Sequence, residues 1–340
     1  MDKTKVGVIG VGHLGRLHAD LYTQVDDAKL VGVFDVDKQK CQEKAKELDL
    51  TAYDSVTDLI EAVDAVNIVT PTTTHFEIAS QALKLNKHVF IEKPITRTED
   101  EAQKLIQIGE EKDRIIQVGH IERFNPAILA LEDVELKPLF IEAHRLASFN
   151  PRGTDVAVIL DLMIHDLDLI LHMVKSKPSQ VSASGVGVIS PTIDIANARI
   201  EFENGCVANV TTSRISAKKM RKMRIFQKNA YISMDFVDGF SEIFYIPEAK
   251  QEPFHDGTLA FSLGQIEDGQ NKKEIKYNRL ERRNVNPLKS ELSSFIQAIR
   301  TNSAPAVSAG EGLSALKLAN EVLREIEKHR MVVEKNADIQ

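Results

Sequence analysis

Four ionisable side chains in the second half of the chain recur at helical spacing. They fall at positions i, i+4, i+7 and i+11 of an otherwise apolar segment and are Asp161, His165, Asp168 and His172. On one helix they would share a face, and burying four such groups without a use costs free energy. A histidine beside a carboxylate suits general acid–base chemistry, which we expect of His165 with Asp161 one turn away. Two alternatives stay open. The histidines and a carboxylate could bind a metal, or the four side chains could be a solvent-exposed row that only caps helices and forms ion pairs.

A second candidate is Glu92-Lys93-Pro94, which directly follows the apolar run His88–Ile91. A lysine at the carboxyl end of a buried strand can donate to a substrate hydroxyl, or lose its proton when partly buried. Glu92 could orient this lysine, and Pro94 allows a cis peptide bond before it. The alternative is a solvated lysine after a strand.

The segment Gly10-Val11-Gly12-His13-Leu14-Gly15 stands between an expected strand and an expected helix, and Asp35 follows twenty positions later. Gly10 permits a tight turn, Gly12 lets a pyrophosphate approach the backbone, and Gly15 allows the helix to pack on the strand. The helix start offers free N–H groups to phosphates. Asp35 would accept hydrogen bonds from a ribose diol and repel a 2′-phosphate, so we expect NAD rather than NADP. The alternative is a glycine turn without a ligand.

Other side chains are expected at the same crevice. Thr70-Pro71-Thr72 follows the strand Ala65–Val69, and His75 begins the next helix, although a histidine there is often a surface residue. The expected cofactor-binding residues are Gly10, Gly12, His13, Leu14, Gly15, Asp35, Thr70, Pro71, His75, Glu92 and Lys93.

Residues near the join between two expected domains could bind a substrate. His120, Arg123 and Asn125 follow the fifth strand, and Arg152 lies further on. Each arginine could hold a phosphate or carboxylate through paired donors, or could instead form an interdomain salt bridge. Asp161 completes the expected substrate-binding set.

The elements that must position these residues change character along the chain. The first part alternates strands, at Val6–Ile9, Leu30–Phe34, Ala65–Val69, His88–Ile91 and Ile115–Val118, with helices at 14–24, 37–48, 55–61, 75–85 and 99–112. We expect Asp37 to cap the second helix, and Thr98 with Glu101 to form a capping box. This alternation predicts a doubly wound parallel sheet, a Rossmann domain over residues 1–122.

The second part, residues 123–340, reads as an α+β domain with a large, mainly antiparallel open sheet. A helix is expected at 160–173, followed by strands at 179–189, 193–203, 206–214, 220–227, 230–236 and 240–246. Asn204-Gly205 predicts a hairpin turn, and Lys228-Asn229 a second turn. Residues 248–272 read as a long loop, and helices at about 288–301 and 310–328 close the chain.

Bulk properties narrow the class of protein. The chain has 340 residues and a net charge of −7, which argues against a nucleic-acid partner. No apolar run approaches the ~18 residues that a membrane span needs. The first five residues run into the first strand and leave no room for a signal peptide. Cys41 and Cys206 match no metal or redox spacing, so we expect reduced thiols, no metal and a cytoplasmic protein.

Together these motifs resemble the glucose–fructose oxidoreductase / inositol dehydrogenase / rhizopine-catabolism (Gfo/Idh/MocA) family. The resemblance rests on the segment 8–15, Thr70-Pro71 with His75, Glu92-Lys93-Pro94, and Asp161 with His165-Asp166. It implies nicotinamide-dependent hydride transfer to or from a hydroxyl carbon of sugars, cyclitols or nucleotide sugars. It further implies that Lys93 touches the reacting hydroxyl and the nicotinamide ribose, that His165 is the acid–base with Asp161 as partner, and that the second sheet forms a homodimer or homotetramer face.

One departure refines the resemblance. Where many relatives have a glycine-rich run before the Asp161 motif, this chain has the apolar segment 156–160. That version, with the segments 119–126 and 150–155, is similar to bacterial UDP-N-acetylglucosamine 3-dehydrogenases. A diphosphate substrate would give Arg123 and Arg152 a purpose. Two rival functions stay open: reduction of a non-sugar substrate such as a linear tetrapyrrole, and a non-catalytic dinucleotide-binding sensor.

Overall fold

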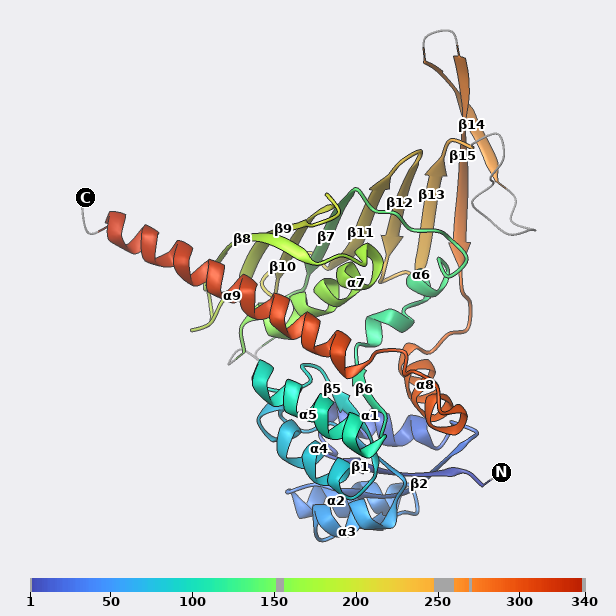
Figure 1. Ribbon diagram of the computed structural model, residues 1–340, viewed down its shortest axis with the longest axis vertical. Coiled ribbons are helices and arrows are strands. Elements are labelled where there is room, and N and C mark those ends of the chain that lie inside the picture. Colours follow the sequence, from blue (N-terminus) through green and yellow to red (C-terminus); the bar gives the residue numbers. More distant parts are fainter. Residues whose placement is uncertain (1, 151–155, 248–259, 269–270, 338–340) are drawn as a thin grey trace. The chain divides into compact units, whose positions relative to one another are not determined.

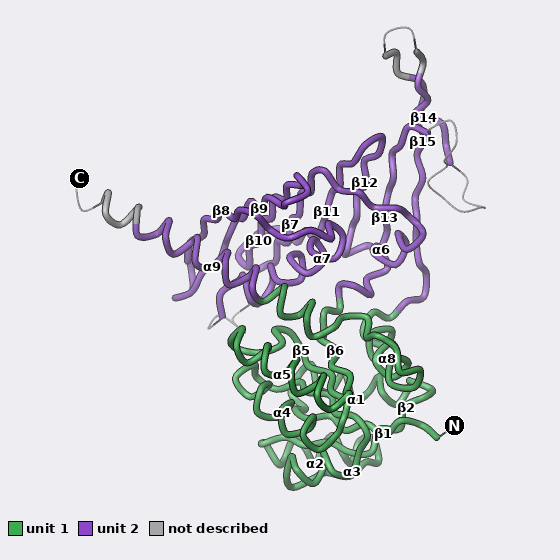
Figure 2. Tube along the Cα trace, viewed as in Figure 1, with its two compact units in different colours: residues 1–121, 286–316 green, residues 122–285, 317–340 purple. Residues whose placement is uncertain are grey.

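The computed structural model describes residues 2–150, 156–247, 260–268 and 271–337, and groups them into two compact units (Figures 1 and 2). Unit 1 comprises residues 1–121 and 286–316, and unit 2 comprises 122–285 and 317–340. Over the described residues, no helix is both long and apolar enough to cross a membrane.

A parallel sheet forms the centre of unit 1 (Figure 1). Its strands are β1 (Thr4–Ile9), β2 (Ala28–Phe34), β3 (Thr51–Ala52), β4 (Ala65–Ile68), β5 (His88–Glu92) and β6 (Ile116–Gly119). Their order in the sheet is β3-β2-β1-β4-β5-β6, and each neighbouring pair is parallel. The order reverses between β1 and β4, which is the switch point where ligands of such sheets bind. The predicted doubly wound fold is confirmed, and the short β3 is a strand that the sequence patterns missed.

Helices join these strands, and their first turns carry the expected signals. The helices of this segment are α1 (His13–Tyr22), α2 (Lys38–Glu47), α3 (Val56–Ala62), the 3-10 turn η1 (Thr72–Thr74), α4 (His75–Lys84) and α5 (Glu99–Lys112). The Asp37 carboxylate accepts from the Lys40 backbone N–H at the start of α2, as predicted. Thr98 and Glu101 form the predicted capping box of α5, with both reciprocal hydrogen bonds present. Such caps satisfy N–H groups that a helix cannot satisfy internally.

A late segment of the chain completes the core of unit 1. Helix α8 (Pro287–Thr301) places Leu292 and Phe295 among the buried residues of α1, β1 and β2. The Phe295 ring meets Phe90 of β5 edge-on, with 5.8 Å between ring centroids. This packing explains why the structure groups residues 286–316 with unit 1, although a two-part division of the sequence places them in the second domain.

Unit 2 is built on an open sheet whose described strands run in the order β14-β15-β13-β12-β11-β7-β10-β9-β8. Their bounds are β7 (Phe140–Leu146), β8 (Pro178–Val186), β9 (Ile195–Phe202), β10 (Val207–Ser213), β11 (Met220–Gln227), β12 (Ala230–Asp235), β13 (Phe240–Tyr245), β14 (Phe261–Asp268) and β15 (Asn271–Glu281). All neighbours pair antiparallel except β7 and β10, which pair parallel. The predicted mainly antiparallel sheet is confirmed, as is the hairpin turn, where Gly205 has φ +85°.

One prediction for the second part is wrong, and one strand was missed. The expected loop 248–272 contains β14 and the first residues of β15, and residues 248–259 and 269–270 lie outside the described residues. The strand β7 was not predicted, although its buried positions alternate as in a half-buried strand.

Helices cover one face of this sheet (Figure 1). They are α6 (Pro126–Leu129), which follows the 3-10 turn η2 (Ile121–Phe124), then α7 (Ile164–Val174) and the later part of α9 (Ala309–Ala337). Directly before α7, residues Ile159–Met163 form a π-helical turn, labelled η3. The wider π turn breaks the α-helical spacing assumed for Asp161, so the predicted single helix over 160–173 is wrong in its first turn.

Candidate active site

The glycine turn after β1 has the geometry that a dinucleotide needs. Gly10 has φ +91°, and a Cβ there would lie 2.6 Å from the Val69 carbonyl oxygen. A Cβ on Gly15 would lie 1.8 Å from the Gly10 carbonyl oxygen, so only glycine fits at that position. A Cβ on Gly12 would meet nothing within 4 Å, so the backbone there is open to a ligand. Gly12 caps α1 without a side-chain hydrogen bond, so the first N–H groups of α1 can serve a phosphate.

Asp35 stands at the end of β2, beside this turn. Its Oδ2 accepts from the Val11 backbone N–H at 2.7 Å, and its Oδ1 accepts from the Asp37 backbone N–H at 2.9 Å. These bonds join the acidic residue to the glycine turn and fix the carboxylate. Each oxygen has further acceptor capacity for a ribose hydroxyl. His13 and Leu14, at the start of α1, are exposed.

His75 joins the segments that follow β4 and β5. Its Nε2 lies 2.9 Å from the Thr70 carbonyl oxygen and its Nδ1 lies 3.0 Å from the Pro94 carbonyl oxygen. Burial lowers the pKa of the imidazole, against the opposing effect of these carbonyls and Glu92. The histidine is buried rather than on the surface, and it sets the positions of Thr70 and Pro71. The Lys93–Pro94 peptide is cis.

Glu92 ends β5 with its carboxylate turned toward α1. Its Oε1 lies 3.2 Å from His18 Nε2, and its Oε2 accepts from the Lys93 backbone N–H at 3.2 Å. Burial would raise the pKa of Glu92, but its interactions with His18 and then with Lys93 bring that pKa below its usual value. Glu92 thus fixes the backbone of Lys93. The sequence predicted, more generally, that Glu92 could orient this lysine.

Arg123 is held inside unit 2. Its Nε and Nη2 both donate to the Asp168 carboxylate at 2.7 Å, and its Nη1 donates to His172 Nδ1 at 2.6 Å. Arg123 and Asp168 are buried. The arginine therefore forms a salt bridge, as in the alternative considered from the sequence, but within one unit. Asp168 is therefore the ion-pair partner of Arg123, and His172 accepts a hydrogen bond from the same guanidinium.

Asp161 and His165 are the two half-buried members of the predicted stripe. Asp161 Oδ2 lies 4.0 Å from Nη2 of Arg214, and the same arginine nitrogen donates to the Val156 carbonyl oxygen at 2.6 Å. Nearby, Asp166 accepts two hydrogen bonds from Arg145, at 2.7 and 2.8 Å. In the described parts of the chain, no group of three or more His, Cys, Asp or Glu could hold a metal ion.

Three other predicted substrate residues have different surroundings. Asn125 is buried; its Oδ1 accepts from the Ala127 backbone N–H to cap α6, and its Nδ2 donates to the Phe236 carbonyl oxygen. His120 follows β6 and is buried. Arg152 lies outside the described residues.

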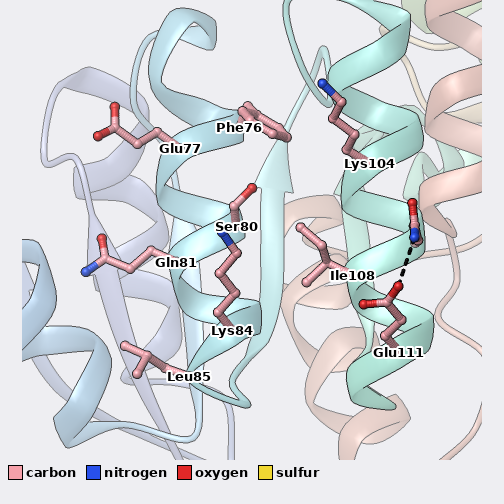
Figure 3. A pocket seen from close by; sticks show the side chains of 10 residues that line it. Phe76, Glu77, Ser80, Gln81, Lys84, Leu85, Lys104, Ile108 and Glu111 are labelled. Atoms are coloured by element: carbon pink, nitrogen blue, oxygen red, sulfur yellow. Dashed lines mark hydrogen bonds between the residues drawn. The ribbon is translucent and has the colours of Figure 1, made fainter.

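A surface groove elsewhere in unit 1 carries none of these residues. It has a volume of about 880 Å³ and lies between α4 and α5, with Phe76, Ser80 and Ile108 on its walls (Figure 3). Lysine and glutamate side chains of the same two helices border it, among them Lys84, Lys104 and Glu77. We assign no chemistry to this groove.

Sequence reasoning missed His18, Asn67 and Arg214. His18 lies one turn beyond the glycine motif, and Asn67 stands inside the apolar run of β4. A polar residue at a strand position buried on both faces was the available signal for Asn67, because such a group needs a partner.

The fold and the site define an NAD-binding oxidoreductase with a second, sheet-based unit. Residues 4–120 match the family model described as "Oxidoreductase family, NAD-binding Rossmann fold" (GFO_IDH_MocA), and residues 142–233 match the "GFO/IDH/MocA C-terminal domain". The chain belongs to the GFO/IDH/MocA oxidoreductase family and is an NAD-dependent dehydrogenase.

Individual relatives agree with this assignment. The chain is 44% identical to "UDP-N-acetylglucosamine 3-dehydrogenase" of Acidithiobacillus ferrooxidans over 71% of this chain and 77% of that protein. It is 26% identical to "Myo-inositol 2-dehydrogenase" of Thermotoga maritima over 96% of this chain and 98% of that protein. A solved structure of the Acidithiobacillus ferrooxidans enzyme superposes with a TM-score of 0.83 at 36% identity, covering 96% of this chain and 99% of that one.

Proposed function

We propose that this dehydrogenase acts on a ring hydroxyl of a UDP-N-acetylglucosamine-like nucleotide sugar. The observation that carries the proposal is the 36% identity to a UDP-N-acetylglucosamine 3-dehydrogenase over nearly the full length of both chains, together with a TM-score of 0.83. The apolar segment 156–160 before Asp161 supports the same subgroup.

NAD, when bound at the glycine turn, supplies the hydride acceptor or donor. Gly10, Gly12 and Gly15 admit the pyrophosphate, and Asp35 selects the ribose that lacks a 2′-phosphate. Thr70 and Pro71 border the same edge of the sheet, where His75 fixes them. Because the carboxyl ends of parallel strands form the ligand-binding edge, we expect Lys93, directly after β5, to contact the cofactor there.

The proton of the reacting hydroxyl needs a base as the hydride leaves. We assign this role to His165, with Asp161 orienting or stabilising the imidazolium and Lys93 donating to the hydroxyl oxygen. Arg214 Nη2 lies 4.0 Å from Asp161 Oδ2, so a guanidinium stands beside that carboxylate. Positioning can supply roughly 7–11 kcal/mol at best, and acid–base help about 10²–10⁴-fold. Of the two arginines first considered for a diphosphate, Arg123 has its donors on Asp168 and His172, so Arg152 carries that assignment.

The test is a turnover screen. Purified protein is mixed with NAD and, in separate reactions, UDP-N-acetylglucosamine, other nucleotide sugars, free sugars and inositols, and absorbance of the reduced nicotinamide is followed. Reduction with UDP-N-acetylglucosamine well above that with free sugars supports the proposal. Reduction only with inositols or free sugars refutes the nucleotide-sugar substrate.

Two rivals can be separated in the same assay. A non-catalytic sensor would bind NAD and turn over nothing, whereas the acid–base pair of Asp161 and His165 favours catalysis. A reductase of a linear tetrapyrrole would oxidise reduced NAD only with that substrate, and the polar set around Asp161 favours a hydroxylated one.

We also propose that the second sheet joins identical chains into a homodimer or homotetramer. Five aromatic rings on the sheet face opposite α6 and α7 stand in one continuous row across adjacent strands: Phe140, Phe226, Tyr231, Phe244 and Tyr277. Neighbouring rings are 5.0–5.9 Å apart, and Phe226 is 38% exposed. Such a row is typical of an interface.

We propose a cytoplasmic location, where the free, buried thiols of Cys41 and Cys206 would stay reduced.

A further inference from the structure

Four buried polar side chains of unit 1 form a chain that ends at the peptide of Lys93. Tyr22 Oη donates to Asn67 Oδ1 at 3.2 Å, and Asn67 Nδ2 donates to His18 Nδ1 at 2.9 Å. His18 Nε2 lies 3.2 Å from Glu92 Oε1, at the long end of the hydrogen-bond range. Glu92 Oε2 in turn accepts from the Lys93 backbone N–H. The members come from α1, β4 and β5.

The direction of these hydrogen bonds determines which ring nitrogen of His18 carries the proton. Because Asn67 donates to Nδ1, that nitrogen carries a lone pair and the ring proton sits on Nε2, facing Glu92. Tyr22, His18 and Asn67 each have 0% exposure, so the protein itself must satisfy their polar groups. A neutral N–H group then faces an ionised carboxylate 3.2 Å away, and the charge of the carboxylate strengthens the attraction to that N–H group.

The surroundings leave the Glu92 carboxylate little room to move. A Cβ on Gly119 of the adjacent β6 would lie 2.8 Å from Glu92 Oε1, so the strand beside it is tight against the carboxylate. The His18 ring meets the Phe90 ring edge-on, with 5.7 Å between centroids, which holds the imidazole plane. The position of Glu92 is therefore determined from several sides.

We propose that His18 is a positioning residue of this dehydrogenase: by donating from Nε2 it holds Glu92 in place, and Glu92 fixes the peptide from which Lys93 projects. Helix α1 begins at the glycine turn and carries His18 one turn later, so the chain links the cofactor-binding turn to Lys93. The inference rests on the proposed role of Lys93 in hydride transfer.

The kinetic test compares two substitutions of the same histidine. His18→Leu fills a similar volume without a donor, and we expect kcat to fall by about 10²-fold, the scale of a small misplacement of a reacting group, while NAD affinity changes little. His18→Gln can still donate toward Glu92 and should recover most of kcat. In a Lys93→Met background, His18→Leu should add almost nothing. Equal loss in the Gln and Leu variants, or an undiminished effect in the Lys93→Met background, overturns the proposal.

A second measurement needs no substrate and no variant that must fold. Nitrogen-15 shifts of the wild-type His18 ring should show a proton on Nε2 and none on Nδ1. A proton on Nδ1 overturns the proposal even if the enzyme is active. If the shifts agree but Lys93→Met keeps full turnover, the role assigned to Lys93 fails instead, and the two failures are distinguished.

Discussion

At the residue scale, motifs with fixed spacing could be predicted, and partners across the fold could not. The glycine turn with Asp35 beside it was readable because local backbone chemistry dictates their order, and the role of Lys93 stays a prediction. Arg123 was expected to face a substrate, and the structure places it on Asp168, a residue of the stripe expected beside His165. Nothing in the local pattern reveals such a pairing, because it depends on which strands and helices meet.

His165 is the residue on which the proposed chemistry most depends. We expect His165→Ala to lose about 10²–10⁴-fold in kcat, the usual worth of acid–base help, while NAD binding measured by calorimetry stays close to wild type. The exposed His329 supplies a control, since His329→Ala should leave both unchanged. Turnover that survives in His165→Ala removes this histidine from the mechanism.

Asp35 should decide the preference for NAD. We expect Asp35→Asn to lose roughly tenfold or more of its selectivity for NAD over NADP, because hydrogen bonds to a charged group are worth about 1.5–3 kcal/mol and the like charge facing a 2′-phosphate is gone. The readout is the ratio of kcat/KM for the two cofactors. Asp37→Asn is the matched control, since asparagine caps α2 as well as aspartate does. A wild-type enzyme that prefers NADP would contradict the ribose argument.

At the element scale, regular helices and strands could be predicted from periodicity and caps, whereas irregular turns could not. The capping box of α5 was readable as Thr98 with Glu101, because its bonds are local. The π turn Ile159–Met163 carries no local signal and shifts Asp161 out of the expected α-helical register. Strand β7 was missed because charged side chains interrupt its apolar positions. Its central place in the sheet comes from pairing with β10 and β11, which are distant in the sequence.

The buried pair that ties η2 to α7 makes a prediction about stability. We expect Asp168→Asn to lower the free energy of unfolding by about 3–5 kcal/mol, because Arg123 would be left buried without its counter-charge. Urea unfolding followed by circular dichroism measures this. The half-exposed pair of Arg224 and Glu142 is the control, and Arg224→Ala should cost less than about 1 kcal/mol. A loss of that small size in Asp168→Asn would mean that the pair is solvated.

His88, at the start of β5, should make folding sensitive to acid. Burial and then the charge of Arg114 lower its pKa to about 4, and its Nδ1 accepts from the Ile115 backbone N–H of the neighbouring segment. The unfolded chain, with an ordinary histidine pKa near 6.5, therefore binds more protons between these values, and stability falls as pH drops from about 6.5 to 4. The loss cannot exceed about 1.4 kcal/mol per pH unit, and partial exposure of the ring reduces it.

The measurement is the free energy of unfolding at several pH values for the wild type and for His88→Asn. The asparagine oxygen can still accept from the Ile115 backbone N–H but does not titrate. We expect the difference between the two proteins to change across this window and to be constant above pH 7. Parallel curves throughout would show that His88 does not titrate differently in the two states.

At the scale of the whole molecule, the fold class was readable because strand–helix alternation gives way to strand–turn–strand. The sequence could not show that α8 packs in unit 1, because its apolar face would suit the core of either unit. Leu292 and Phe295 settle this by packing with β1 and β2 of unit 1. The two units are therefore not two consecutive pieces of sequence, and a variant cut after residue 122 should expose this part of the unit 1 core.

The aromatic row of the second sheet predicts assembly. Its five rings stand on five adjacent strands in register, and Arg224 and Glu142 on the same face add a polar border. We expect Phe226→Asp to convert the proposed dimer or tetramer to smaller species in sedimentation velocity, because a carboxylate would be buried in the apolar centre of the interface. Val188→Asp, at an exposed apolar residue just beyond β8 and away from the row, controls for added charge and should leave the mass unchanged. A wild-type chain that sediments as a monomer at micromolar concentration, or an unchanged mass for Phe226→Asp, would show that this face does not join identical chains.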